Sequence, residues 1–153
     1  MKLQSDLREL FESLVANRVE FLVVGGHAVA FHGYPRFTGD VDVFVRATPE
    51  NARRILAALD AFGFGATGLE EADLTAPDTV VQLGRAPNRI DLLTSITDVS
   101  FDEAWPSRVA GSLGDVPVSF ISKELLLRNK AAVRRPIDVA DVARLESLPP
   151  IDE

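Results

Sequence analysis

The chain has 153 residues, of which 46% are hydrophobic and 25% charged, the composition of an ordinary globular domain. Its formal net charge of -7 makes a large nucleic acid an unfavourable partner, and the lack of cysteine excludes disulfides and thiolate metal sites. No apolar run is long enough to span a bilayer, and the N-terminus lacks the apolar core of a signal peptide. We expect a cytoplasmic protein with a single domain over residues 1–148 and a short tail at 149–153.

The first part of the chain alternates between helical and extended patterns. Apolar residues at helical spacing indicate helices, and short apolar or alternating runs indicate strands. The elements expected here are a helix after a Ser5 cap, a buried strand at 21–24, a short helix from Gly25-Gly26 to Phe31, a strand at 41–45, and a helix that begins at Thr48-Pro49 and ends at Gly63.

The second part carries two hairpin signals and two helical patterns, after an irregular or partly helical stretch at 63–77. The elements expected are strands at 79–83 and 89–93, a helical turn at 101–105, a hairpin of 109–113 with 116–120 around Gly114-Asp115, a helix capped by Ser122, and a last helix from Pro136 to Leu145. This order predicts an α+β fold, in which a small mixed β-sheet has flanking helices and the C-terminal helices pack on it.

Two carboxylates at the start of the strand at 41–45 are the first chemical signal. Asp40 and Asp42 are two residues apart, so both side chains project from the same face, while Val41 and Val43 occupy the other. Carboxylates this close repel each other unless a cation lies between them, and Mg2+ or Mn2+ prefers such oxygen ligands. An isolated Asp-Val-Asp on a solvated strand face is the competing interpretation.

The double glycine before the short helix is the second signal. Gly25 and Gly26 would let phosphate groups approach backbone N–H groups at the helix start. A tight turn from strand to helix would need the same residues. Together with Asp40 and Asp42, the glycines have a joint explanation, since metals held by the carboxylates would bridge the phosphates of a nucleotide.

Asp91 is the best candidate for a third carboxylate. It stands between Ile90 and Leu92 in a separate strand, where a charge is costly unless it is paired or bound to metal. Its role would be to take the proton from an attacking hydroxyl or to complete a second metal site. The alternative is an edge-strand aspartate whose side chain lies in water.

These residues resemble the signature of the DNA polymerase beta-type nucleotidyltransferase superfamily, with Gly25, Gly26, Asp40, Asp42 and Asp91 at its positions. The sequence around them is similar to that of small bacterial members, including abortive-infection and toxin–antitoxin-associated nucleotidyltransferases. The C-terminal segment supports the resemblance through Lys130, Arg135-Pro136, Asp138 and Asp141.

The resemblance implies a mixed sheet with flanking helices and Mg2+-dependent transfer of a nucleoside monophosphate from an NTP, with release of pyrophosphate. It also places Arg36, Thr38 and Lys130 near the nucleotide. One departure is Gly26, because many superfamily members have a serine there whose hydroxyl can bind phosphate.

Several side chains keep competing interpretations. Arg36 would bind phosphate or pair with Asp40, and Lys130 could be a solvated helix lysine. Asp138 and Asp141 are expected to pair with arginines rather than bind metal; the candidates are Arg134, Arg135 and Arg144. His27 and His32 are expected to pack rather than to bind zinc.

Two functions follow from these observations. The first is an enzyme that transfers a nucleotidyl group to an acceptor hydroxyl of a protein, a tRNA or a small molecule; the resemblance adds a toxin–antitoxin or phage-defence setting, with a cognate toxin or antitoxin as partner. The second is a non-catalytic module of the same fold that binds a nucleotide or a partner. Three intact carboxylates favour the enzyme.

Overall fold

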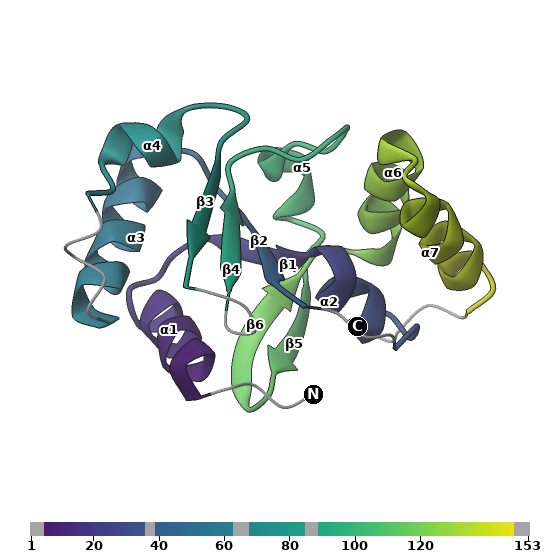
Figure 1. Cartoon of the computed structure of the whole chain (residues 1–153), viewed down its shortest axis with the longest axis horizontal. Helices are drawn as coiled ribbons and strands as arrows, with labels where there is room; N and C mark the ends of the chain where they lie inside the picture. Colours follow the sequence, from purple (N-terminus) through teal and green to yellow (C-terminus); the bar gives the residue numbers. More distant parts are fainter. Residues whose placement is uncertain (1–4, 36–38, 63–67, 85–88, 149–153) are drawn as a thin grey trace.

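The computed structural model describes residues 5–35, 39–62, 68–84 and 89–148 (Figure 1). Six strands form one mixed sheet in the order β3-β4-β2-β1-β6-β5. The central strands pair in both senses, since β2 is antiparallel to β1 but parallel to β4, and β1 is parallel to β6. The strands are β1 (Phe21–Val24), β2 (Val41–Val45), β3 (Val80–Leu83), β4 (Ile90–Leu93), β5 (Val109–Leu113) and β6 (Val116–Phe120).

Helices flank this sheet, as the sequence predicted. They are α1 (Ser5–Ala16), α2 (Gly25–Phe31), α3 (Pro49–Phe62), α4 (Glu71–Thr75), α5 (Phe101–Ala104), α6 (Lys123–Val133) and α7 (Pro136–Glu146). The described part of the segment 63–77 contains the short helix α4, in keeping with its mixed pattern. No helix within the described ranges combines the length and the apolar composition needed to cross a bilayer.

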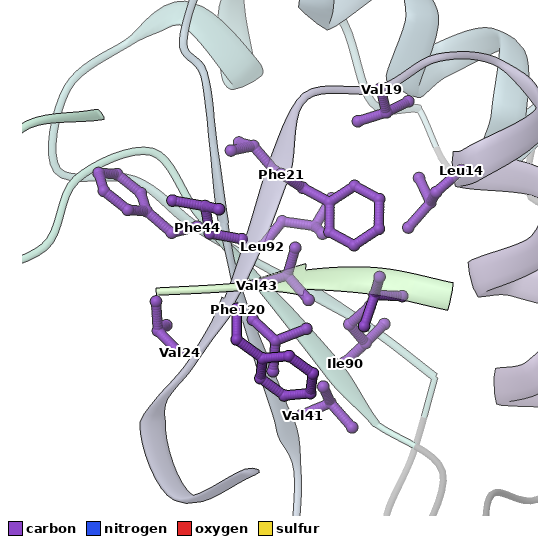
Figure 2. Close-up of a cluster of buried hydrophobic side chains, with 14 of the residues drawn as sticks. Leu14, Val19, Phe21, Val24, Val41, Val43, Phe44, Ile90, Leu92 and Phe120 are labelled. Atoms are coloured by element: carbon purple, nitrogen blue, oxygen red, sulfur yellow. The ribbon is translucent and has the colours of Figure 1, made fainter. Parts of the chain in front are cut away.

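The main core lies on the sheet face that carries Val41 and Val43. In the parallel pair of β2 with β4, these valines stand beside Ile90 and Leu92, and all four side chains are buried. Figure 2 shows them in one cluster with side chains from β1 and β6 and with Leu14 of α1. The period-two pattern therefore places Asp42 and Asp91 on the face opposite these valines, as expected, although Phe44 on the carboxylate face of β2 is also buried, against Phe101.

Asn51 fixes the start of α3 against the sheet. The helix has the predicted cap, because the N–H of Asn51 donates to Thr48 Oγ1 at 3.3 Å. The buried Asn51 amide is satisfied by the main chain, since it accepts from the N–H of Glu20 and donates to the carbonyls of Glu20 and Arg46. This side chain links α3 to the residues next to β1 and β2.

The hairpin of β5 and β6 holds α2 against the sheet. Its two-residue turn has a positive φ of 59° at Gly114, where glycine is favoured. Phe31 of α2 stacks on Phe120 of β6, with ring centroids 4.0 Å apart. These rings lie over Gly111, where an added Cβ would stand 2.5 Å from Phe31 Cε1 and 2.9 Å from Phe120 Cε1.

The two C-terminal helices pack on each other, and α6 contacts α2 (Figure 1). His32, directly after α2, lies with its Nε2 2.7 Å from the carbonyl oxygen of Ile121, just before α6. This buried contact agrees with a packing role for His32. The α6–α7 pair is thus placed beside the helix that begins at Gly25.

Gly111→Ala should destabilise the fold by roughly 1–3 kcal/mol, because the new methyl group overlaps the two stacked rings. Denaturant unfolding followed by circular dichroism measures the change. Gly39→Ala is the matched control, since a Cβ at Gly39 meets nothing within 4 Å. Equal stability of both variants would show that the ring stack does not constrain residue 111.

Candidate active site

The pairing of β2 with β4 brings two of the three predicted carboxylates together. Asp42 and Asp91 are direct partners in this parallel register, so they share a face on strands about 5 Å apart. Asp91 lies on an interior strand, between β2 and β3, and is only 9% exposed. The alternative of an edge-strand aspartate in water is therefore wrong.

Gly25 borders the same carboxylates. Val24 pairs with Asp42 in the antiparallel register of β1 and β2, so the following residue passes directly beside the Asp42 side chain. A Cβ at Gly25 would stand 2.3 Å from Asp42 Oδ2, and the residue has a φ of +66°. Glycine is thus required here both for the turn and for the close approach of a carboxylate to the main chain.

Burial and mutual repulsion disturb the ionisation of this pair. Burial raises the pKa of Asp42 to about 6, with further contributions from the negative charges of Asp91 and Asp40. Burial also raises the pKa of Asp91, although the Arg89 guanidinium opposes the rise. Carboxylates held together at such a cost are typical of functional sites.

Arg89 is the main site residue that the sequence interpretation missed. Its Nη2 forms an ion pair with Asp40 Oδ2, and its Nε lies 3.2 Å from Asp91 Oδ1. The guanidinium therefore bridges two of the predicted metal ligands. The signal was present in the sequence, since Arg89 and Asp91 are two residues apart in an alternating strand and so share a face.

Lys130 is a buried residue of an ion-pair cluster. Its Nζ lies 3.1 Å from Asp138 Oδ1 and 2.9 Å from Asp141 Oδ2, and the lysine is 3% exposed. The alternative of a solvated helix lysine is wrong. The predicted ion pair of Asp138 with Arg135 is present. The sequence interpretation considered only arginines as partners, however, and both Asp138 and Asp141 pair with Lys130.

Arg135 carries the charge of this cluster towards the carboxylates. Asp138 receives two hydrogen bonds from its guanidinium, from Nε at 2.7 Å and from Nη2 at 3.2 Å. Burial alone would raise the pKa of Asp138, but the hydrogen bonds from Arg135 and Lys130 hold it below its usual value. The Arg135 side chain stays 67% exposed, and its positive charge acts on Asp42 by lowering the pKa of that carboxyl.

The donor set fits a hard divalent cation in its chemistry. It offers carboxylate oxygens, and Asp91 Oδ1 is buried without a hydrogen-bond partner. Within the described ranges, however, no three acidic or histidine side chains converge as a ready metal cage. The Arg89 guanidinium pairs with both Asp40 and Asp91. Arg36 and Thr38, predicted to contact the nucleotide, lie outside the described residues.

Asp42→Asn should stabilise the protein in a metal-free buffer with EDTA at pH 8. The folded-state pKa of Asp42 is raised from 3.8 to about 6, so its charge costs nothing below pH 4 and up to roughly 3 kcal/mol above pH 7. The stability gain of the neutral variant should therefore grow as the pH rises from 4 to 7. Thermal unfolding across this range measures it, and a gain that does not change with pH would contradict the prediction.

Two solved structures have a fold similar to that of this chain. The crystal structure of the lincosamide antibiotic adenylyltransferase LnuA, lincomycin-bound, has a similar fold with a TM-score of 0.57 at 15% identity, over 96% of this chain and 98% of that one. An antigenic nucleotidyltransferase-like protein from Paracoccidioides brasiliensis gives a TM-score of 0.51 at 16% identity, over 93% of this chain and 76% of that one. No curated protein sequence matches.

The family match extends over almost the whole sequence. Residues 3–149 match the family described as nucleotidyl transferase of unknown function (DUF2204). The mixed sheet with flanking helices agrees with the fold of the two solved neighbours. The chain belongs to this family and is a nucleotidyltransferase enzyme.

Proposed function

We propose that this enzyme uses divalent metal, Mg2+ or Mn2+, to transfer a nucleoside monophosphate from an NTP to an acceptor hydroxyl. The observation that carries the proposal is the register of β2 and β4, which sets Asp42 beside Asp91 on partly desolvated strands. Asp40, Asp42 and Asp91 would hold the metal. When bound, the metal neutralises the charge of the phosphates and of the developing transition state.

The phosphate end of the nucleotide would lie at the start of α2. The N-cap residue Val24 gives no side-chain hydrogen bond to the first turn, so Gly25 and Gly26 can present main-chain N–H groups to an anion. Arg135, whose charge acts on Asp42, supplies positive charge near the phosphates and is held in orientation by Asp138. Lys130 then supports the nucleotide site by fixing Asp138, while Arg36 and Thr38 stay predicted contacts.

The reaction needs a proton acceptor as well as phosphate ligands. The acceptor oxygen forms a bond to the α-phosphorus, and the bond from that phosphorus to the oxygen that bridges the α- and β-phosphates breaks. The hydroxyl proton passes to a carboxylate oxygen of Asp91, which lies beside Asp42 on the neighbouring strand. Pyrophosphate leaves with the negative charge of the broken bond.

A small hydroxyl-bearing compound is the acceptor that the proposal favours. The net charge of -7 disfavours a tRNA, whose phosphates need clustered lysine and arginine. The similar fold of an adenylyltransferase for a lincosamide antibiotic supports an acceptor of that size. A protein hydroxyl in a toxin–antitoxin or phage-defence setting is the second acceptor class, supported by the motif resemblance.

Asp42→Asn should lower the rate of pyrophosphate release by at least about 100-fold, since even residues that only support metal ligands cost up to that much. Each NTP is tested with Mg2+ or Mn2+ against a panel of hydroxyl-bearing antibiotics and candidate protein acceptors. The control is Asp115→Asn, whose carboxylate pairs with Arg8 on another part of the surface. Equal release by wild type and Asp42→Asn under all conditions would refute metal-dependent catalysis.

Arg135→Gln should weaken NTP binding on the order of 10-fold, because one charge-assisted contact to phosphate is lost. Titration calorimetry with an NTP and Mg2+ measures the dissociation constant without any acceptor. Arg134→Gln is the matched control, since the neighbouring arginine donates to the carbonyl of Ala131 instead of Asp138. If both variants weaken NTP binding to a similar extent, the effect comes from general surface charge and not from a contact of Arg135 with phosphate.

A further inference from the structure

We propose that the positively charged Arg89 guanidinium occupies the metal position between Asp40 and Asp91 and is displaced when the divalent ion binds. The inference rests on the metal dependence proposed above. It gives a role to Arg89, which the sequence interpretation missed.

The contacts of Arg89 are those of a cation shared by two ligands. Its Nη2 pairs with Asp40 Oδ2, and its Nε lies 3.2 Å from Asp91 Oδ1. The guanidinium is planar and wide, so its presence keeps these oxygens apart, and the described acidic side chains do not converge on one point. A divalent ion binds carboxylate oxygens at a much shorter range, and it cannot do so while the guanidinium lies between them.

The contact with Asp91 is also poorly formed. Arg89 Nε and Asp91 Oδ1 are both buried, yet neither atom makes a hydrogen bond. Charge attraction therefore holds them at 3.2 Å without an aligned donor and acceptor. A buried polar atom left in this state is costly, and a metal ion would satisfy Asp91 Oδ1 where the guanidinium does not.

Arg89 has a route away from the site. Its side chain is 33% exposed, and its residue stands just before β4. The main chain is fixed, because the Arg89 carbonyl accepts from the N–H of Val41 at 3.2 Å. Metal binding can thus move the side chain towards solvent without disturbing the register that holds Asp42 and Asp91.

The first test measures metal affinity without turnover. Electron paramagnetic resonance of free Mn2+ gives the dissociation constant of wild type, Arg89→Gln and Arg128→Gln. Arg89→Gln should bind Mn2+ at least about 10-fold more tightly, since a competing positive charge is removed. Arg128 is the matched control because it also pairs with two acids, Asp98 and Glu103, and its variant should stay within about 2-fold of wild type.

The second test observes the displacement in the wild-type chain and does not depend on a variant that folds poorly. The side-chain Nε–H signal of Arg89 is followed by NMR during a Mg2+ titration, and Arg89→Lys assigns it by removing it. The signal should shift and exchange faster with water as the metal binds. Arg128 provides an internal reference that should not change.

The outcomes separate this inference from the proposed function. Tighter Mn2+ binding by Arg89→Gln together with a Mg2+-dependent Arg89 signal supports the displacement. Equal Mn2+ affinity of wild type and Arg89→Gln, with an unchanged Arg89 signal, overturns the displacement and leaves metal dependence standing. Failure of both proteins to bind Mn2+ overturns the metal dependence and, with it, the role of Arg89.

Discussion

The parallel register of β2 with β4 is the constraint on which the candidate site depends. It sets Asp42 beside Asp91 on one face of the sheet, and it sets Val43 beside Leu92 on the other. A slip of one residue between the two strands would turn one of the carboxylates into the core and its apolar neighbour out of it, at a large cost in free energy. The hydrophobic effect acts on the apolar residues next to Asp42 and Asp91 in each strand. By fixing the register of these strands, it also fixes the position of the carboxylates. The site and the main core are two faces of the same strands.

In this arrangement the negative charges of the carboxylates destabilise the folded protein. Burial and neighbouring charge raise the pKa of Asp42 to about 6, so its ionised form destabilises the metal-free protein. Two arginines from different elements reduce the repulsion among the carboxylates. Arg89 pairs with Asp40 and Asp91, and the charge of Arg135, in the link between α6 and α7, lowers the pKa of Asp42. Strain of this kind persists only where the surrounding core is strong enough to hold it, and the fully buried valines of β2 provide that support.

The sequence predicts most of the fold because its signals are local. Alternation in β2, the turn at Gly114 and the caps at Thr48 and Ser122 each depend on a few neighbouring residues, and each is confirmed. The burial of Lys130 could not be predicted in this way, because it depends on how α7 lies against α6. Pairings across the tertiary structure have no fixed spacing in the sequence. Arg89 is an intermediate case. Its spacing from Asp91 in the sequence predicts that both side chains lie on one face of the strand, but it does not predict the ion pair of Arg89 with Asp40.

The charge balance around the carboxylates explains why one arginine is compatible with a metal site. Asp138 and Asp141 pair with the buried Lys130, and Asp138 also pairs with Arg135, so the positive charge that these two residues bring near the site is partly neutralised. Arg89 pairs with Asp40 and Asp91, and its single positive charge cannot neutralise both carboxylates. The remaining negative charge would favour the proposed divalent cation, while the ion-paired Arg89 limits repulsion between the carboxylates when no metal is bound. A fully neutralised site would gain stability but lose this attraction, and a site without Arg89 would repel itself more strongly whenever the metal left.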